Sequence, residues 1–348
     1  MPTNRPNNYN RSSIQRNNVA TVARQDEALR LRQSGMSFIE IARTLGYTPN
    51  GVPRPQSAAE AVRAAERRAN INGITNSPVA TTTPVATSQY NRTFGVEVEF
   101  FGITQGVANR ALLSAGLLSQ IEDYNHLTRP HWKLTTDASV NSSGTGKGVG
   151  LEMVSPVLQG PDGFAQLATA VKALLNAGAK VDKTCGIHVH IGADGLTGLD
   201  IMRVIDIYTQ NSNHIHTVLA ASRHATRWAK PYGNAELSHA RTVLTGATTN
   251  TILRTVANRN FDRYQTVNVT SYAKYGTLEF RQHQGSLNGE KIASWVKFVM
   301  SLTDRATTMS DVDVADFGSL SSLLDNIGID DSAKDYLNTR SVSMVGSR

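Results

Sequence analysis

Acidic, imidazole and guanidinium side chains recur at alternate positions in three short segments of this sequence. The segments are FGVEVEF at 94–100, CGIHVHIG at 185–192 and TLEFRQH at 277–283. Because the side chains of a β-strand alternate between its two faces, residues i and i+2 share a face. If the segments are strands, the side chains that share a face are Glu97 with Glu99, His188 with His190, and Glu279 with Arg281 and His283.

Three strands of one sheet can bring such side chains to one point, which three unrelated loops rarely do. Carboxylates and imidazoles gathered in this way suit divalent cations, and an arginine beside them suits a phosphate group. We therefore expect an enzyme whose site handles a metal ion and a phosphate.

Each pair also has a purely structural interpretation. Glu97 and Glu99 would repel each other on one face without a cation, but they could also lie on a solvated strand face. A single histidine is usually a core residue, whereas two at alternate strand positions are more often a metal ligand and its hydrogen-bonding partner. Glu279 and Arg281 could form an ion pair that only stabilises the strand.

A further carboxylate, Glu152, lies in the segment GLEMVSP at 150–156, which we interpret as a short strand. The glycine-rich segment before it invites comparison with a phosphate-binding loop, but its spacing excludes that motif. Asn141 stands where the first glycine is needed, and Lys147 is followed by glycine rather than by serine or threonine. We expect a surface loop near the site instead.

More cationic and polar side chains lie between the second and third segments, and they suit phosphate oxygens or a substrate carboxylate. They are Arg223 in AASRH, Arg241, and Arg259, Arg263, Tyr264 and Asn268 in NRNFDRYQTVN. Each arginine could equally be a solvated surface residue. The lone cysteine, Cys185, is better explained as a small buried residue than as a nucleophile.

The positive charge is concentrated in the first quarter of the 348-residue chain. Residues 1–92 contain twelve arginines, no lysine and five acidic residues, so they carry the whole net charge of +7 and the remainder is neutral. This asymmetry favours a nucleic-acid or other acidic partner, although basic tails are often only solvated. A single cysteine, no run of eighteen apolar residues and no apolar segment at the start predict a cytoplasmic protein without a membrane span.

The N-terminal region divides into three parts. Residues 1–22 are polar and rich in asparagine, so we expect them to be disordered. Residues 23–69 show helical periodicity broken by a glycine turn, with Ser37 and Glu40 at the spacing of a capping box. This order resembles a basic helix-turn-helix module that could bind nucleic acid, or a helical hairpin packed on the main domain. Residues 70–92 are rich in Thr, Pro and Asn, which predicts a linker.

Residues 93–309 alternate between strand-like and helical segments. This pattern, with chemically active side chains on several strands, predicts an α+β catalytic domain in which helices back a curved, mainly antiparallel sheet. Residues 310–348 are first acidic and then amphipathic, so we expect a C-terminal helical tail.

The order of these motifs over 93–305 resembles that of the amidoligase family, which belongs to the carboxylate–amine ligase superfamily together with glutamine synthetase and glutamate–cysteine ligase. The matching elements are, in order, GVEVEF, a W-x-x-x-x-D-x-S element formed by Trp132, Asp137 and Ser139, LE-x-V-S-P, CGIHVHIG, SR, RY-x-x-x-N and TLEFRQH. The resemblance does not extend to residues 1–92.

This resemblance implies a glutamine synthetase-like domain that binds ATP and two Mg²⁺ or Mn²⁺ ions. Such an enzyme activates a carboxylate as an acyl phosphate, which an amine then attacks. By similarity, one metal would be held by Glu97, His188 and Glu279. The other metal would be held by Glu99 and Glu152.

The resemblance also implies which side chains act on the nucleotide. Catalysis is expected from Arg281, Glu279 and Arg263. Nucleotide contacts are expected from Arg281, Arg263, Arg223 and Asn268.

The second metal has fewer acids here than in glutamine synthetases, and Asp137 is a candidate to fill the gap. Two other functions stay open. A zinc-dependent hydrolase would use His188 and His190, but it leaves the other site residues without a role. A nucleic-acid-binding protein with a degenerate ligase domain would act through residues 23–69. The sequence does not select among amino-acid, peptide and protein substrates.

Overall fold

The chain separates into two compact units, Met1–Val85 and Ala86–Arg348. A computed structural model describes residues 11–33, 36, 38–48, 57–58, 61–62, 65, 90–140, 149–310 and 314–345. The division between the units falls inside the expected linker at 70–92, of which residues 70–89 lie outside the described residues.

The N-terminal unit contains helix α1 (Arg11–Gln33) and helix α2 (Phe38–Thr44). Helix α1 begins well inside the segment 1–22 that we expected to be disordered, and residues 1–10 lie outside the described residues. A small apolar cluster joins α1, α2 and the short described pieces after them; its buried members are Ala28, Leu31, Ile41, Ala42, Ala58, Ala61 and Val62. The expected cap at Ser37 and most of the basic helix over 57–69 lie outside the described residues, so nucleic-acid binding stays a prediction.

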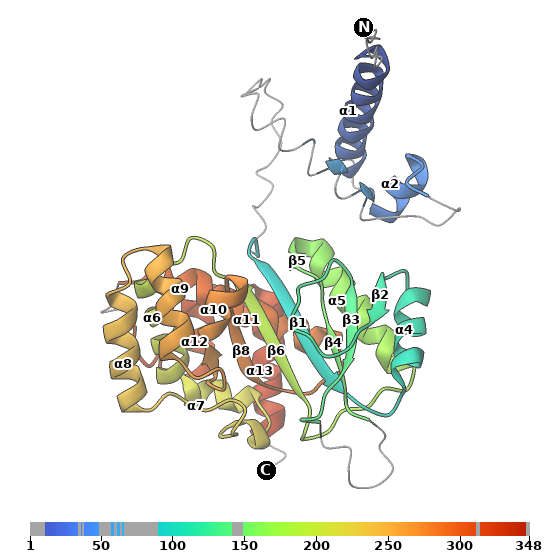
Figure 1. Ribbon diagram of the computed structural model, residues 1–348. Helices are drawn as coiled ribbons and strands as arrows, with labels where there is room; N and C mark the ends of the chain where they lie inside the picture. The colour runs from blue at the N-terminus through green and yellow to red at the C-terminus, as the bar shows by residue number, and fades with distance from the viewer. Residues whose placement is uncertain are drawn as a thin grey trace, which may run out of the picture. The chain divides into compact units, whose positions relative to one another are not determined.

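The second unit is built on one sheet whose strand order is β2-β3-β4-β1-β6-β8-β7 (Figure 1). In that order the strands are Ser119–Ile121, Trp132–Thr136, Leu151–Val154, Thr93–Phe100, Gly186–Gly192, Thr277–Gln284 and Val267–Asn268. A short strand β5 (Leu158–Gln159) pairs with the start of β1. All pairs are antiparallel except β2 with β3.

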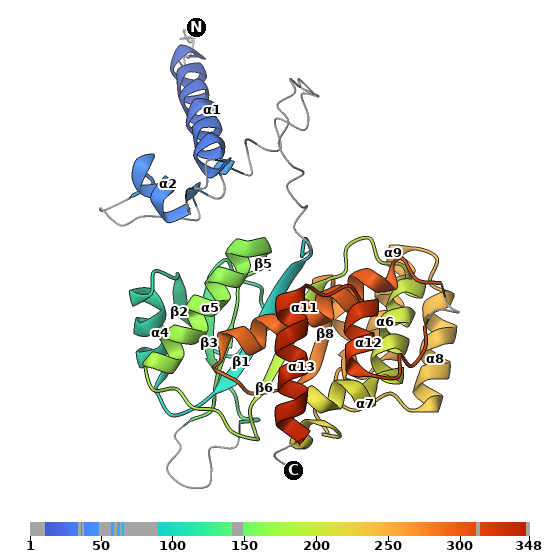
Figure 2. The ribbon, with the colours of Figure 1, turned by 180° about the vertical axis from the view of Figure 1, so that it is seen from behind.

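Helices cover one face of this sheet. Figure 2 shows α5 (Gly160–Asn176), α11 (Gly289–Ala306) and α13 (Asp331–Val345) lying across it. The other helices are α4 (Gln105–Ser114), α6 (Gly198–Gln210), α7 (Ser212–Ile215), α8 (Asn234–Thr245), α9 (Asn250–Asn260), α10 (Thr270–Tyr275) and α12 (Leu320–Asn326), with 3₁₀ turns η2 (His216–Val218) and η3 (Ala221–Arg223). The predicted α+β architecture, a mainly antiparallel sheet backed by helices, is confirmed.

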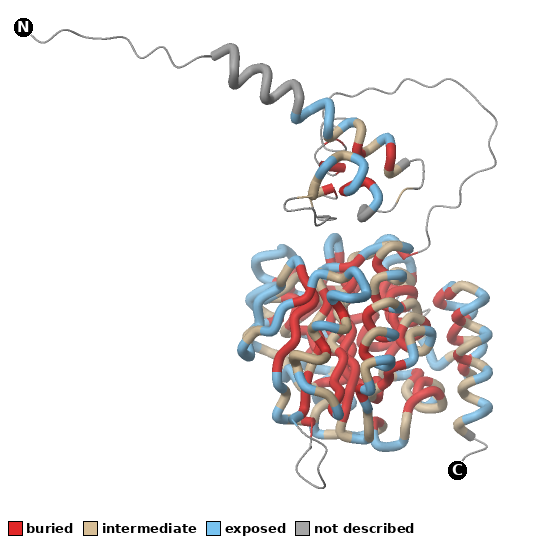
Figure 3. The backbone as a smooth tube through the Cα atoms, turned by 90° about the vertical axis from the view of Figure 1, so that its right-hand side faces the viewer, coloured by how far each residue is buried: buried red, intermediate tan, exposed pale blue. Residues whose placement is uncertain are grey.

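The alternation of strand β1 explains why the two faces of the sheet differ. Val96, Val98 and Phe100 are buried in the main core, together with residues such as Trp295 on α11. Figure 3 shows the buried residues concentrated in the strands and on the helices beside them. Each large apolar side chain that is fully buried contributes about 1.5–3 kcal/mol, so this face fixes the register. The alternate residue Glu97 is thereby held on the face away from the core.

The turn into β8 places the start of that strand beside α10. Helix α10 ends at Gly276, whose φ of 69° lies in the left-handed region. This conformation strains any residue with a side chain, so glycine suits the position. The tight turn lets Ser271 of α10 reach Glu279 of β8.

Helices α12 and α13 occupy the part of the chain for which we expected a C-terminal helical tail. Among the helices that the structure describes, none is both long and apolar enough to cross a membrane.

Candidate active site

The face of the sheet away from α5 and α11 carries charged side chains in rows that run across the strands. Glu97 of β1 lies opposite His188 of β6, and Glu99 of β1 lies opposite Glu152 of β4. His190 pairs in the same way with Glu279 of β8. Directly opposite residues on one face have Cβ atoms about 4.5–5.5 Å apart, so antiparallel pairing concentrates these groups.

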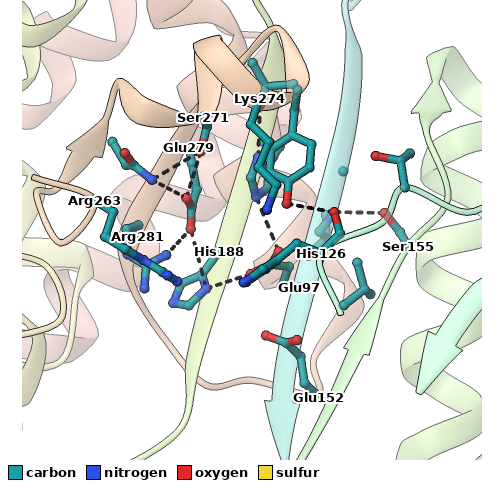
Figure 4. Close-up of a pocket in the computed structure, with 18 of the residues that line it drawn as sticks. Glu97, His126, Glu152, Ser155, His188, Arg263, Ser271, Lys274, Glu279 and Arg281 are labelled. Atoms are coloured by element: carbon teal, nitrogen blue, oxygen red, sulfur yellow. Dashed lines mark hydrogen bonds and ion pairs between the residues drawn. The ribbon is translucent and has the colours of Figure 1, made fainter. Parts of the chain in front are cut away.

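Glu97, His188 and Glu279 form the first of two groups that could hold a metal ion, and each offers a ligand atom within 4.8 Å of the others. The His188 Nδ1 atom lies 2.9 Å from Glu97 Oε2 and 3.7 Å from Glu279 Oε1. Figure 4 shows these three side chains converging from three strands.

Glu99, Glu152 and His188 form the second group, again with ligand atoms within 4.8 Å of one another. Here the other ring nitrogen is involved, because His188 Nε2 lies 3.7 Å from Glu99 Oε1. The backbone N–H of Gly186 donates a hydrogen bond of 2.6 Å to the second oxygen of Glu99. The imidazole of His188 therefore stands between the two groups, with one nitrogen toward each.

Glu279 is held in place by three neighbours. The Asn268 side-chain amide donates to Oε2 at 2.6 Å, and the Ser271 hydroxyl donates to the same oxygen at 3.0 Å. The guanidinium of Arg281 donates to Oε1 through Nη1. Asn268, for which a nucleotide contact stays a prediction, orients a carboxylate of the first group in this structure.

Two buried arginines flank the groups. Arg281 also donates from Nε to the Trp228 carbonyl at 3.1 Å, and its guanidinium lies 5.9 Å from the centre of the Tyr264 ring. Arg223 donates from Nη2 to the Arg281 carbonyl at 2.8 Å, and no carboxylate in the described part of the chain forms an ion pair with it. Arg263 is exposed and lies 5.2 Å from the ring centre of Tyr264.

His190 lies beside the first group without belonging to either group. Its Nδ1 atom lies 3.0 Å from the Thr277 hydroxyl oxygen, and its Nε2 atom lies 3.4 Å from Glu97 Oε1. The sequence pattern predicted that one of the two histidines is a metal ligand and the other its hydrogen-bonding partner. In the structure His188 belongs to both ligand groups, whereas His190 belongs to neither and lies beside Glu97.

The prediction that His283 shares a face with Arg281 is wrong. A β-bulge interrupts the pairing of β6 with β8, so that Val189 faces Phe280 whereas Ile187 faces His283. The extra residue turns His283 toward the core, where its ring lies 5.2 Å from that of Trp295. Burial lowers the pKa of His283 to about 3.

Two other expected residues take different places. Arg241 donates from Nη2 to both carboxylate oxygens of Asp206 on α6, at 2.8 and 2.9 Å, and does not line the cavity described below. Cys185 is buried, and burial raises the pKa of its thiol to about 11. The thiol is therefore protonated at neutral pH, as expected for a structural cysteine.

Asp137, the proposed extra acid of the second group, lines the same cavity as Glu99 and Glu152. Its Oδ1 atom accepts a hydrogen bond of 2.7 Å from the backbone N–H of Ser139, and Asp137 belongs to neither metal-ligand group found among the described residues. The glycine-rich loop follows it at 141–148, outside the described residues.

The carboxylates differ in their protonation. Burial raises the pKa of Glu152 well above its ordinary value, and repulsion from Glu97 and Asp137 raises it further. Burial also raises the pKa of Glu99. For Glu97 burial acts in the same direction, but hydrogen bonds with His188 and His190 outweigh it, and its pKa lies well below the ordinary value.

Glu279 behaves like Glu97: burial raises its pKa, but the charges of Arg281, His190 and His188 together outweigh burial, and the pKa lies below the ordinary value. Glu152 has no hydrogen-bond or ion-pair partner among the described residues. The charged form of Glu152 is disfavoured, because the positive charge of Lys133 does not outweigh burial and the repulsion from Glu97, Asp137 and Glu99. Each of the two groups offers two carboxylates and one imidazole. Because Mg²⁺ and Mn²⁺ prefer oxygen ligands, these donor sets fit a divalent cation of that type.

A cavity of about 490 Å³ opens over this face and includes side chains that we did not single out from the sequence. The additional lining residues include His126, Lys133, Trp228, Lys274 and Tyr275. Lys133 could have been found, because it alternates with Thr135 on a strand-like segment of the Trp132–Ser139 motif. The others lie in loops or on a short helix, where no periodicity marks them.

Comparison with known proteins places most of this second unit in one family. The model of a family described as "putative amidoligase enzyme" matches residues 90–303, which include every strand that the structure describes and every side chain of the two groups. No curated protein matches the chain.

Proposed function

The chain belongs to the amidoligase family, and we propose that it is an ATP-dependent carboxylate–amine ligase. The family supports a ligase-type function in general. In the proposed reaction a substrate carboxylate oxygen bonds to the γ-phosphorus of ATP as ADP leaves, which gives an acyl phosphate. An amine nitrogen then bonds to the acyl carbon, phosphate leaves, and the nitrogen loses a proton.

The observation that carries this proposal is the pair of adjacent acidic groups that share His188, with a buried arginine beside them. Mg²⁺ or Mn²⁺, held by Glu97, His188 and Glu279 and by Glu99, Glu152 and His188, would neutralise phosphate charge and align the reacting oxygens. This donor set needs no rearrangement of the sheet, because strand pairing alone brings the ligand atoms together.

We assign the nucleotide to the β8 side of the cavity. Trp228 and Tyr264 line the cavity there, with ring centres 5.4 Å apart. Aromatic faces of this kind suit a purine ring. Arg281, Arg263 and Arg223 are then the cations nearest to the phosphates, as the resemblance implied.

Arg281 is assigned to the transferring phosphoryl group. Its hydrogen bonds to Glu279 and Trp228 involve Nη1 and Nε, and among the described residues Nη2 forms none. The two bonds hold the guanidinium plane, so that the free nitrogen can meet developing charge without reorganisation. Asn268 and Ser271 orient Glu279 and thereby support the first metal group.

A zinc hydrolase is less well supported. Zinc sites are rich in histidine or cysteine, whereas each group here contains one imidazole and two carboxylates. His190, the second histidine of the strand, is engaged with Thr277 and Glu97.

The test is a screen for ADP release. The full chain is incubated with ATP, Mg²⁺ and sets of carboxylic acids, peptides and amines, and compared with the Glu97→Gln variant and with Lys172→Met, which changes an exposed residue of α5. We expect substrate-dependent ADP release that falls at least about 10-fold in Glu97→Gln and is unchanged in Lys172→Met. Nucleotide-independent hydrolysis that requires zinc would contradict the proposal.

A further inference from the structure

The segment 122–131, here called the strap, connects β2 with β3 and lines one side of the cavity through residues 124–128. Its base is tied by Glu122, which pairs with Arg129 at 2.9 Å and His131 at 2.7 Å. Its middle is tied from two directions, because Lys133 donates to the Asn125 carbonyl at 2.7 Å and the Tyr275 hydroxyl donates to the His126 carbonyl at 3.0 Å. The strap is therefore a fixed wall of the site.

Two lysines face the cavity beside the strap. The ammonium of Lys133 is buried, and within the described part of the chain it donates only to the two neutral oxygens of Asn125, at 2.7 and 3.4 Å. Lys274 lines the cavity from α10, and no described carboxylate forms an ion pair with either lysine.

These charges also act on each other. Burial lowers the pKa of Lys274, and the positive charges of Arg263 and Lys133 lower it further, which together outweigh the opposite effect of Glu97. A bound anion would relieve this repulsion, so this side of the cavity is prepared for an acidic group.

The position of Lys133 separates this anion from the phosphates assigned to Arg281. Lys133 lies opposite Val154, Val154 lies opposite Glu97, and Glu97 lies opposite His188. Lys133 and Arg281 thus flank the metal-ligand groups from opposite sides, on strands β3 and β8. With strands about 4.8 Å apart, the Lys133 backbone lies roughly 10 Å from that of Glu97.

The mouth of the cavity next to the lysines is apolar and exposed. Tyr124 and Leu127 of the strap are 59% and 56% exposed, and Val157 after β4 is 61% exposed. All three line the cavity. Large apolar side chains left open around a binding site mark contact with an apolar group of a ligand. Free glutamate or aspartate, which also has two carboxylates, offers no large apolar group, whereas a peptide can present one beside its acidic residue.

We propose that the carboxylate substrate is an acidic peptide segment. Lys133 and Lys274 bind a second carboxylate next to the one that reacts, and Tyr124, Leu127 and Val157 contact an adjacent apolar side chain. This assignment rests on the proposed ligase function and names the substrate class for the same site.

The test uses three acetylated dipeptides and full-length protein with Mg²⁺ and the non-hydrolysable ATP analogue that has an imido bridge between its β- and γ-phosphates. Acetyl-Leu-Glu has two carboxylates and an apolar side chain, acetyl-Leu-Glu-amide has one carboxylate, and acetyl-Ser-Glu lacks the apolar side chain. Dissociation constants are measured by calorimetry for the peptides and, separately, for the ATP analogue.

We expect acetyl-Leu-Glu to bind at least 10-fold more tightly than its amide and 3- to 10-fold more tightly than acetyl-Ser-Glu. Lys274→Met and Lys133→Met should each abolish the preference for the acid over the amide, whereas Lys172→Met keeps it. Leu127→Ser should abolish the preference for leucine. Lys274 is exposed, so its variant tests the assignment even if Lys133→Met does not fold.

Equal binding of acid and amide to the wild type, or no detectable peptide binding, would overturn the inference. An equal loss of ATP-analogue affinity in Lys274→Met would also overturn it, because the lysines would then bind phosphates. Failure of the proposed function looks different: the wild type would show no Mg²⁺-dependent binding of the ATP analogue at all.

Discussion

Replacing Glu152 by glutamine should stabilise the protein in the absence of metal. Glu152 lies opposite Glu99, is largely buried, and has no hydrogen-bond or ion-pair partner among the described residues. A buried polar group without a partner costs about 1–3 kcal/mol, and an amide of nearly the same shape removes the charge. For a unit of this size, that corresponds to a melting temperature roughly 2–10 °C higher in the presence of a chelator.

The same substitution should weaken the response to metal. Ions at 100 times their dissociation constant stabilise a protein by about 2.7 kcal/mol, and loss of one ligand should reduce affinity by about 10-fold or more. We therefore expect Mg²⁺ or Mn²⁺ to raise the melting temperature of the wild type clearly and that of Glu152→Gln much less. The matched control is Glu236→Gln, which changes an exposed residue of α8. It should change neither the stability in chelator nor the stabilisation by metal by more than about 0.5 kcal/mol.

The pH dependence gives a second check on Glu152. Its pKa in the folded protein is raised above the ordinary 4.5, so the folded state binds this proton more tightly than the unfolded state. The destabilisation is thus absent below about pH 4.5 and grows as the pH rises toward the folded-state pKa. The advantage of Glu152→Gln should be largest at neutral pH and vanish near pH 4. A variant that melts lower than the wild type in chelator at pH 7, or that keeps the full metal response, would refute this reasoning.

Three further predictions concern other parts of the molecule. Arg281→Lys keeps the positive charge but loses the planar guanidinium group, so kcat should fall roughly 100-fold while ATP affinity changes little. A lower melting temperature with unchanged kcat would show that Arg281 only pairs with Glu279. Residues 86–348 should fold and bind the ATP analogue with wild-type affinity, measured by circular dichroism and calorimetry, because all residues of both metal groups lie in that unit; an insoluble fragment would contradict this. His283 has a folded-state pKa of about 3, below its ordinary 6.5, so it lowers stability as the pH falls below 6.5. Denaturant titrations should show that the wild type loses roughly 1.5–2 kcal/mol more than His283→Gln between pH 6.5 and pH 5. Parallel curves for the two proteins would disprove it.

The strand period of two was sufficient to anticipate much of the site. It gave the common face of Glu97 and Glu99, because β1 runs without interruption and its apolar residues all face the core. It failed for His283, because the β-bulge in β8 depends on how two strands pair and leaves no local mark in the sequence. Whether alternation persists along a strand is decided by its partner.

The residues of the cavity wall were harder to anticipate for a related reason. The strap and Lys274 reach the site through loops and a short helix, whose paths are set by tertiary hydrogen bonds such as that from Tyr275 to His126. Arg241 shows the converse case: its sequence neighbourhood suggested a role at the site, but α8 places it beside Asp206. The types of these residues indicated what they could bind, but their positions relative to the site could be learned only from the fold.

The most direct test of the ligase mechanism follows oxygen from substrate to phosphate. A peptide or amino acid that supports ADP release is prepared with ¹⁸O in its carboxylates, and the phosphate released in the presence of an amine is examined by mass spectrometry. Activation through an acyl phosphate predicts one ¹⁸O atom in each phosphate and an amide product with one fewer labelled oxygen. Phosphate without label, or release of AMP in place of ADP, would contradict the account.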